Sequence, residues 1–412
     1  MKKQIPLHLS FLLLPLVCFS AEPQKADLNT LRQTHQWFAF RDAVQGMANP
    51  PDIVRGMVAC RFNDLKGCEE FMFRVAKTGT AGNEVAVAHA DLMLFYMTLG
   101  RCRSAFPHYE AAVSASEPMR SALDGAGTGS LLQAYAQFPD MSVEAHRASS
   151  LQYDQRRQHI EAPVSINGMP GTYILDTGAG FSAINESEAR RLGMRVVEIS
   201  ASPAVGFAGA TGSVNKVGVA GRVDLGGIQL GNVPFLIFSD SAMAGLLPAR
   251  GGALGIQVLI ACETLRWNDA GVVELGFPPS ERREMPPANL YLDNLVLHAQ
   301  VEFGGQKLDF ALDTGNYGSR LHESFANLFP ATVKAAGRTD KWTSGGFAGQ
   351  REYPATILAE IELMLGQKPI IMRPAPVVSF PGAWGHGLLG LDVFKGAHAV
   401  TLDFVSMKLT LE

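Results

Sequence analysis

The sequence predicts a multidomain α+β protein in which an N-terminal all-α region precedes two β-rich lobes in tandem. Apolar residues repeat at helical spacing through residues 28–138, where strand patterns are few. Further along, the tripeptide Asp-Thr-Gly occurs at 176–178 and again at 313–315, each time at the end of a hydrophobic run. With 412 residues and 47% apolar content, the chain is long enough for several packed cores.

These patterns divide the chain into five segments, the first of which is a leader. The division is a signal peptide at residues 1–21, a helical domain at 22–140, a polar linker at 141–157, a first lobe at 158–283 and a second lobe at 284–412. The leader has a basic start, an apolar core at residues 9–19 and small residues at its end, which is typical of a bacterial export signal. We therefore expect a periplasmic or secreted protein. We also expect no transmembrane segment in the mature chain, because later apolar runs are too short to cross a bilayer.

The helical region shows its clearest pattern over residues 88–113, where two helices are separated by a break at Gly100. This pattern resembles a tetratricopeptide helix pair, in which small residues let two helices approach closely. An earlier hairpin over residues 51–62 and 66–77 would stack on it, and residues 125–129 are expected to form a loop. A simple helical bundle explains the same pattern equally well.

Four cysteines follow the leader. In an oxidising compartment we expect one disulfide in the helical region, either Cys60–Cys68 or a pair that includes Cys102. Cys262 lies in an apolar setting in the first lobe, so we expect it to be a buried free thiol. The sequence leaves the pairing open.

The similarity between the two lobes extends well beyond the tripeptide. Aligning the two tripeptides also aligns strand patterns that end in Gly-containing turns. The matched segments are 164–168 with 301–305, 182–187 with 319–324, 206–209 with 346–349, and 253–256 with 388–391. An internal repeat of this length predicts two domain-sized units with the same order of elements.

These segments resemble the lobes of the pepsin and retropepsin group of aspartic proteases. Residues 173–179, Tyr-Ile-Leu-Asp-Thr-Gly-Ala, are similar to the retropepsin active-site strand, and the apolar-apolar-Gly segments are similar to that family's second loop. The resemblance covers residues 158–412 and implies β-barrel-like acid-protease lobes with one cleft between them. Retropepsins assemble this cleft from two identical chains, whereas both halves lie on one chain here.

The resemblance implies that Asp176 and Asp313 are the catalytic residues. Two carboxyl groups about 3 Å apart cannot both ionise, so one can activate a water while the other protonates the carbonyl oxygen of a peptide bond. This division of roles is the established one for aspartic proteases. Any apparent pKa would then belong to the pair of carboxyl groups rather than to one residue.

The resemblance also implies roles for neighbouring residues. Support of the active-site loops is implied for Thr177, Gly178, Ala179, Thr314, Gly315 and Asn316. A flap and substrate-binding role is implied for Gly206, Phe207, Gly209, Gly346, Phe347 and Gly349. A loop beneath the two carboxyl groups is implied for Leu254, Gly255, Leu389 and Gly390. Pepsin-like enzymes carry a hydroxyl residue where this chain has Ala179 and Asn316, so we expect raised carboxyl pKa values and activity that extends to weakly acidic or near-neutral pH.

Other chemistries have less support. Residues 178–183 outline a dinucleotide-binding fingerprint, but the second copy keeps the aspartate and loses the glycine spacing. The histidines lack the spacing of metal ligands, so we expect no cofactor and no metal. The net charge is −4 and basic runs are absent, so we expect no nucleic-acid partner.

The sequence therefore predicts an exported aspartic endopeptidase that acts on peptide or protein substrates in extended form. The alternative is a catalytically silent peptide- or protein-binding adaptor, built from a helical-repeat domain and a protease fold. The helical domain could bind a protein partner, or cover the cleft as a prosegment or inhibitor. These roles of the helical domain stay open at the level of sequence.

Overall fold

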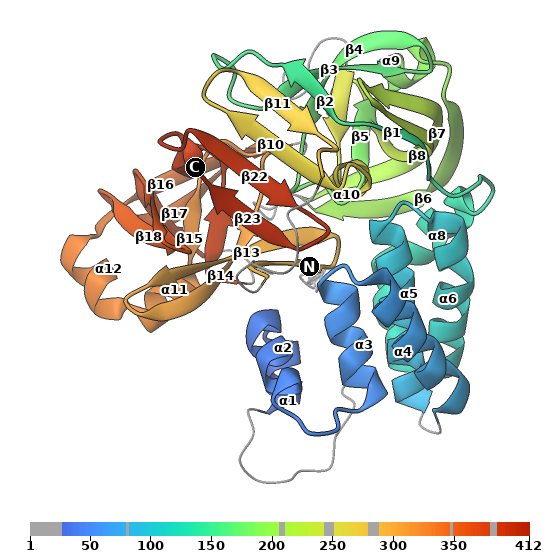
Figure 1. Cartoon of the computed structure of the whole chain (residues 1–412), viewed down its shortest axis with the longest axis horizontal. Helices are drawn as coiled ribbons and strands as arrows, with labels where there is room; N and C mark the ends of the chain where they lie inside the picture. The colour runs from blue at the N-terminus through green and yellow to red at the C-terminus, as the bar shows by residue number, and fades with distance from the viewer. Residues whose placement is uncertain are drawn as a thin grey trace, which may run out of the picture.

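A computed structural model describes residues 27–79, 82–205, 211–242, 251–278, 288–346, 349–379 and 385–412. Helices make up the N-terminal part and strands dominate the remainder, which confirms the expected order of an all-α region and a β-rich region. In Figure 1 the helices lie beside and below two β-rich lobes, and a further group of strands lies between these lobes.

The N-terminal helices form successive hairpins. Their bounds are α1 Leu28–Gln33, α2 Trp37–Gln45, α3 Asp52–Arg61, α4 Leu65–Thr78, α5 Gly82–Thr98, α6 Cys102–Ala115, α7 Glu117–Gly125 and α8 Thr128–Tyr135. Helix α5 is buried on most of its surface, and the expected break follows it at Gly100, which has a φ of 69°. The α3–α4 and α5–α6 pairs coincide with the two expected hairpins. In the described part of the chain, no helix is both long and apolar enough to cross a membrane.

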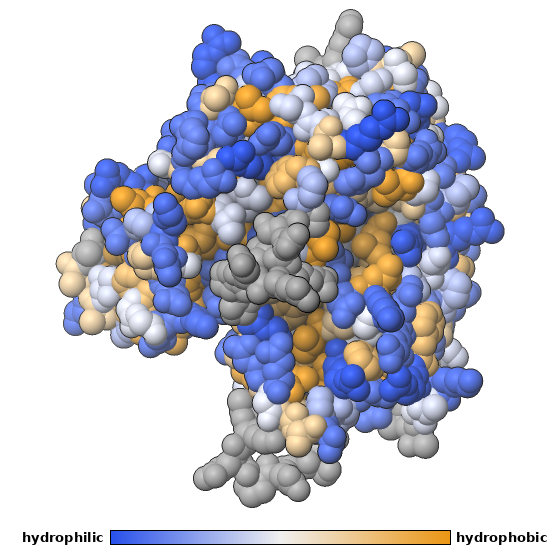
Figure 2. Space-filling view, viewed as in Figure 1, coloured by the Kyte–Doolittle hydropathy of each residue, from blue (hydrophilic) through white to orange (hydrophobic). Residues whose placement is uncertain are grey.

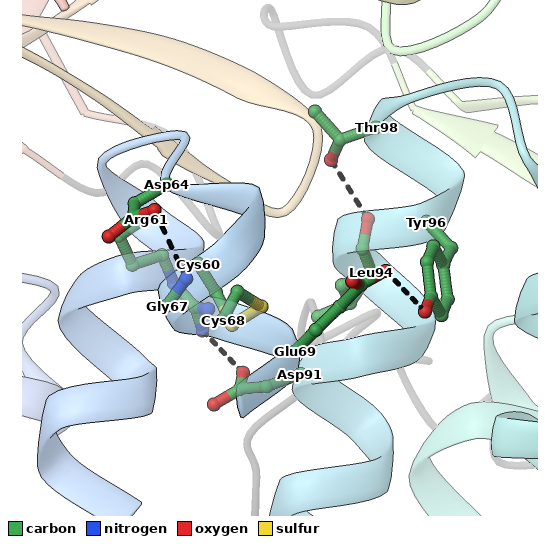
Figure 3. The surroundings of a disulfide bond; sticks show 10 residues. All are labelled: Cys60, Arg61, Asp64, Gly67, Cys68, Glu69, Asp91, Leu94, Tyr96 and Thr98. Carbon is green, nitrogen blue, oxygen red and sulfur yellow. Dashed lines mark hydrogen bonds and ion pairs between the residues drawn. A yellow bond between two sulfur atoms is a disulfide. The ribbon is translucent and has the colours of Figure 1, made fainter. Parts of the chain in front are cut away.

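One disulfide joins the hairpin of α3 and α4. It links Cys60 with Cys68, which decides between the pairings left open by the sequence. Cys102 and Cys262 are buried free thiols, as expected for Cys262. Figure 3 shows the disulfide beside Arg61 of α3, whose guanidinium pairs with Asp91 of α5.

The first lobe consists of a twisted sheet with two short helices. Its elements are β1 Ser142–His146, β3 Glu161–Ile166, β4 Met169–Leu175, β5 Ser182–Asn185, α9 Glu186–Arg191, β6 Arg195–Val205, β7 Thr211–Leu225, β8 Ile228–Phe238, β9 Gly251–Leu254 and α10 Ile256–Ala261. The strand order is β1-β8-β5-β9-β4-β3-β7-β6. The β3–β4 turn uses Asn167 and Gly168, both at positive φ, as a two-residue hairpin requires.

The second lobe has the same core strand order. Its elements are β12 Leu290–Asp293, β13 Val296–Phe303, β14 Gln306–Leu312, β15 Arg320–His322, α11 Glu323–Leu328, α12 Pro330–Ala336, β16 Arg338–Gly346, β17 Gly349–Leu358, β18 Ile361–Leu365, β19 Lys368–Met372, β20 Ala375–Val378, β21 Gly387–Leu389 and the 3-10 helix η1 Leu391–Phe394. The series β20-β15-β21-β14-β13 corresponds to β8-β5-β9-β4-β3 in the first lobe. The directions also agree, since β14 runs parallel to β21 as β4 runs parallel to β9.

A five-stranded sheet connects the two lobes. It contains β2 Ser149–Gln152, β10 Thr264–Asn268, β11 Val272–Leu275, β22 Ala399–Asp403 and β23 Lys408–Leu411, in the order β2-β11-β10-β22-β23. The segment expected to be a polar linker, residues 141–157, supplies β1 and β2. Strand β1 pairs with β8, and β2 pairs with β11, so backbone hydrogen bonds order a segment whose side chains are largely exposed.

The helical domain packs against both lobes. Tyr135 of α8 stacks on Phe181 at 5.5 Å between ring centroids, and its hydroxyl donates to the carbonyl of Phe235 at 2.8 Å. Phe38 of α2 packs against Tyr291 of the second lobe, with 4.9 Å between ring centroids. Apolar residues reach the surface along this junction between helices and lobes (Figure 2). The helices, first lobe and second lobe therefore share continuous buried contacts.

Candidate active site

The two Asp-Thr-Gly tripeptides begin where the central strands β4 and β14 end. The backbone N–H of Asp176 donates to the carbonyl of Leu254 at 3.0 Å, and that of Asp313 donates to Leu389 at 3.0 Å. Each aspartate is therefore held by the apolar-apolar-Gly segment of its own lobe. This is the arrangement that the sequence assigned to Leu254 and Leu389.

The two threonines join the loops through four hydrogen bonds. The hydroxyl of Thr177 donates to the carbonyl of Leu312 at 2.8 Å, and that of Thr314 donates to Leu175 at 2.6 Å. Each hydroxyl also accepts the backbone N–H of the opposite threonine at 3.0 Å. Both threonine side chains are fully buried, so the four bonds fix one loop against the other.

Replacing Thr314 with valine should destabilise the junction of the loops. Valine keeps the shape but leaves the buried N–H of Thr177 and the carbonyl of Leu175 without partners, which costs about 1–3 kcal/mol for such a group. Urea unfolding of T314V should show this loss, together with reduced activity. T410V is the matched control, because Thr410 lies exposed on β23. Equal stability of T314V and T410V would contradict the role of the threonines.

The two catalytic candidates face each other across the lobe boundary. Their carboxyl groups share a hydrogen bond. A side chain at Gly178 would place its Cβ 2.3 Å from Cγ of Asp313, and one at Gly315 would lie 2.3 Å from Cγ of Asp176. Both glycines are therefore required because each one lies against the opposite carboxyl group.

The pKa values of the two carboxyl groups are raised to different extents. Burial raises the pKa of Asp313 well above its ordinary value, and the charge of Asp176 raises it further. Burial also raises the pKa of Asp176, but the N–H of Gly178 opposes this effect. Oδ1 of Asp176 accepts N–H donors from Gly178 at 2.9 Å and Ala179 at 3.1 Å. The structure thus favours an ionised Asp176 beside a protonated Asp313.

Ala179 and Asn316 act differently in the two loops. The N–H of Ala179 donates to the Asp176 carboxylate, whereas that of Asn316 donates to the main-chain carbonyl of Asp313 at 3.2 Å. The Asn316 side chain accepts from Gly318 within its own loop, at 3.3 Å. The raised pKa values follow the expected direction, but burial is their main cause rather than the missing hydroxyl groups.

A pair of serines that the sequence analysis aligned, but did not assign, supports the lower loops. Ser182 accepts the N–H of Gly255 at 3.1 Å, and Ser319 accepts that of Gly390 at 2.8 Å. Their matched positions in the repeat were the available signal. Ser319 also bonds Asp392 through its N–H and its hydroxyl, which gives Asp392 a structural role.

Two long hairpins lead up to the expected flap segments. Strands β6 and β7 pair as far as Val205 and Thr211, and β16 and β17 pair as far as Gly346 and Gly349. The remaining flap candidates, which are Gly206, Phe207, Gly209 and Phe347, fall outside the described residues. Helix α8 contacts β6 and β7 below the first tip.

Two ionisable side chains near the dyad were missed by the sequence analysis. The N–H of Leu175 donates to Ile160 at 3.0 Å, which brings His159 opposite Asp176, and the pKa of His159 is lowered by burial while Asp176 raises it. Arg320 of β15 is fully buried and acts electrostatically on Asp313. His159 lies 17 residues before Asp176 and Arg320 lies seven residues after Asp313, and neither forms a recognised motif with its carboxylate. Among the residues described, no group of three or more His, Cys, Asp or Glu could hold a metal ion.

Comparisons with known proteins place a family resemblance on the first lobe. Residues 162–258 match the family model described as aspartyl protease, and this segment includes Asp176 and Leu254. Among solved structures, the chain is similar to a retropepsin-like aspartic protease from Rickettsia conorii, with 16% sequence identity and a TM-score of 0.22. That alignment covers 34% of this chain and 96% of the other. A comparison with curated proteins gives no match. The matched segment of this chain is thus similar to aspartyl proteases.

Proposed function

We propose that the protein is an exported aspartic endopeptidase, in which two tandem lobes hold a water molecule between Asp176 and Asp313. The hydrogen bond between these carboxyl groups, each pressed against the opposite glycine, carries the proposal. Burying two carboxyl groups together opposes folding, because the charged forms lose hydration. A pair of carboxyl groups with raised pKa values in such a place is typical of an acid–base catalyst.

The two carboxyl groups would divide the chemistry of amide hydrolysis. Asp176, whose charge is stabilised by two N–H donors, would take a proton from the water as it attacks the peptide carbonyl carbon. Asp313, whose pKa is raised further, would hold the proton that passes to the carbonyl oxygen. Proton transfer to the leaving nitrogen then breaks the C–N bond and restores the shared proton.

The substrate would be an extended peptide. The β6–β7 and β16–β17 hairpins offer backbone groups with which a strand-like peptide can pair. The raised carboxyl pKa values support activity at weakly acidic to near-neutral pH. The Cys60–Cys68 disulfide, together with the leader, supports an oxidising compartment outside the cytoplasm.

The helical domain is proposed to be a permanent part of this enzyme. Gln257, directly after the loop beneath the dyad, donates to the carbonyl of Met97 in α5 at 2.7 Å. Phe181, three residues after Gly178, stacks on Tyr135 of α8. A prosegment that leaves during activation would expose these buried groups. Docking of a separate protein partner on the helices stays a prediction, as does their tetratricopeptide character.

The test is digestion of an unfolded protein mixture by the purified chain between about pH 3 and pH 8, with peptides mapped by mass spectrometry. We expect internal cleavages whose rate is greatest at weakly acidic to near-neutral pH. D176N is the matched control, because it keeps the shape of the side chain and removes the base. The absence of new peptide ends at every pH would refute the proposal, and so would equal cleavage by D176N.

A further inference from the structure

Arg320 occupies the floor of the second lobe beside Asp313. It lies on β15, which pairs with β21 so that Arg320 is opposite Leu388. Leu388 in turn lies beside Ala311 of β14, two residues before Asp313. Side chains two apart on a strand share a face, so Arg320 and Asp313 project to the same side of the sheet. The Arg320 side chain is fully buried there.

The guanidinium lies between this floor and the second-lobe hairpin. Its Cζ is 5.2 Å from the ring centroid of Trp342 on β16, and Trp342 is paired with Tyr353 on β17. Arginine is suited to such a position, since its weakly hydrated plane stacks on an aromatic face and stays charged when buried. Trp342 of the hairpin thus packs against the guanidinium that β15 places next to the dyad.

The position of the first lobe that matches Arg320 carries no cation. The repeat aligns Arg320 with Ala183, which offers only a methyl group. On that side the ionisable neighbour of the dyad is His159, opposite Asp176, and the repeat aligns His159 with Val296. One carboxyl group therefore has a permanent cation beside it, whereas the other has an imidazole that titrates.

Resting on the peptidase function proposed above, we propose that Arg320 is a positioning residue that fixes the pH range in which the dyad works. Burial and the charge of Asp176 raise the pKa of Asp313, and the Arg320 guanidinium opposes both. Burial lowers the pKa of Arg320 itself to about 10, against the influence of Asp313 and Tyr353, so Arg320 is charged throughout the working range. Its loss would shift the titration of both carboxyl groups to higher pH.

The experiment compares pH profiles of kcat/KM for the full chain and for R320M, R320Q and R320K. Both neutral variants should lose about threefold or more of the parent's activity one pH unit below its optimum, and should gain relative activity one unit above it. R320K replaces the guanidinium by an ammonium whose pKa burial lowers further, so its profile should lie between those of the parent and the neutral variants. R338M is the matched control, because Arg338 lies on the same hairpin with a side chain that is 77% exposed.

The inference would be overturned if a folded neutral variant had the same pH profile of kcat/KM as the parent. It would also be overturned if the variant lost activity equally at every pH, with no shift of the profile. A second measurement works without cleavage. The pH dependence of the stability difference between D313N and the parent reports the titration of Asp313, and R320Q should extend it to higher pH. Absence of cleavage by the wild type would reject the proposed function, while this stability measurement would still decide whether Arg320 acts on Asp313.

Discussion

Replacing Asp313 with asparagine is expected to abolish peptide cleavage and, at neutral pH, to stabilise the fold. The loss of one acid–base group should lower kcat/KM by about a thousandfold. The gain in stability follows from the raised pKa of the Asp313 carboxyl, because the folded state then resists an ionisation that the unfolded state undergoes freely. Asparagine does not titrate, so it avoids this cost.

The sign of the pH dependence is specific. A carboxyl group whose folded pKa is raised loses stability as pH rises from its ordinary value of 3.8 towards the folded value, and no further above it. The advantage of D313N in melting temperature should therefore be absent below about pH 3.5 and should grow with pH, by about 1.4 kcal/mol for each unit of pKa difference. Thermal melts of parent and variant across this range measure it.

D340N is the matched control for these melts, because the side chain of Asp340 is 51% exposed on β16. It should leave both cleavage and stability near those of the parent. Two results would contradict the assignment of Asp313. One is residual cleavage by D313N at the parent's rate, and the other is a D313N melting temperature that falls relative to the parent as pH rises.

The second large effect is expected at Arg61, which joins the helical domain to the second lobe. Arg61 Nε lies 3.0 Å from Asp293 Oδ1, and its Nη2 lies 2.9 Å from Asp91 Oδ1. Asp293 Oδ2 also accepts from Trp37 Nε1 at 2.9 Å and contacts His35 Nδ1 at 2.5 Å. Burial alone would raise the pKa of Asp293, but His35 and Arg61 outweigh it and lower the pKa.

Replacing Arg61 with methionine leaves the carboxylates of Asp91 and Asp293 buried beside each other without this partner. Breaking a buried pair in this way costs about 3–5 kcal/mol, which urea unfolding of R61M would reveal. R55M is the matched control on the same helix, since Arg55 is 43% exposed and should contribute within about 1 kcal/mol. Equal unfolding midpoints for R61M and R55M would show that the buried network adds nothing to stability.

R61M should also reduce catalysis, because the network continues to the active-site loop. Asp293 is followed by Asn294 and Leu295, which form a turn at positive φ. A side chain at Gly180 would place its Cβ 2.9 Å from Cβ of Leu295, so this turn lies against the loop that carries Asp176. A displaced turn would alter the separation of the carboxyl groups, which a fall in kcat at saturating substrate would report.

The parts of the site that the sequence could predict are those with a local pattern. Asp176 and Asp313 each end an apolar strand, and the glycines and threonines follow directly. The helix pair around Gly100 could also be predicted, because a glycine separates two segments with helical periodicity; in the structure this glycine has a positive φ. These features depend on residues that are neighbours along the chain, and the structure places them where the pattern indicated.

What the sequence could not provide depends on contacts between distant segments. Strands β1 and β2 have side chains that are exposed or half-buried, so their order arises from pairing with β8 and β11 rather than from a hydrophobic pattern. Nothing in the sequence distinguishes Arg320 from other arginines on strands. Only the pairing of β21 with both β15 and β14 brings it beside Asp313. Arg61 pairs with Asp293, which lies 232 residues further along the chain. A single sequence holds no signal for such an ion pair.

Both aspartates lie on one polypeptide, and the pairing of β10 with β22 joins the two lobes that carry them. A cleft made from two copies of one chain has an exact twofold axis, so a peptide, which runs from amino to carboxyl end, can enter it in either orientation with equal energy. In this molecule each side of the groove can change alone, as Arg320 and Ala183 illustrate. In the peptidase proposed above, this asymmetry would let the site distinguish the two directions of a bound peptide.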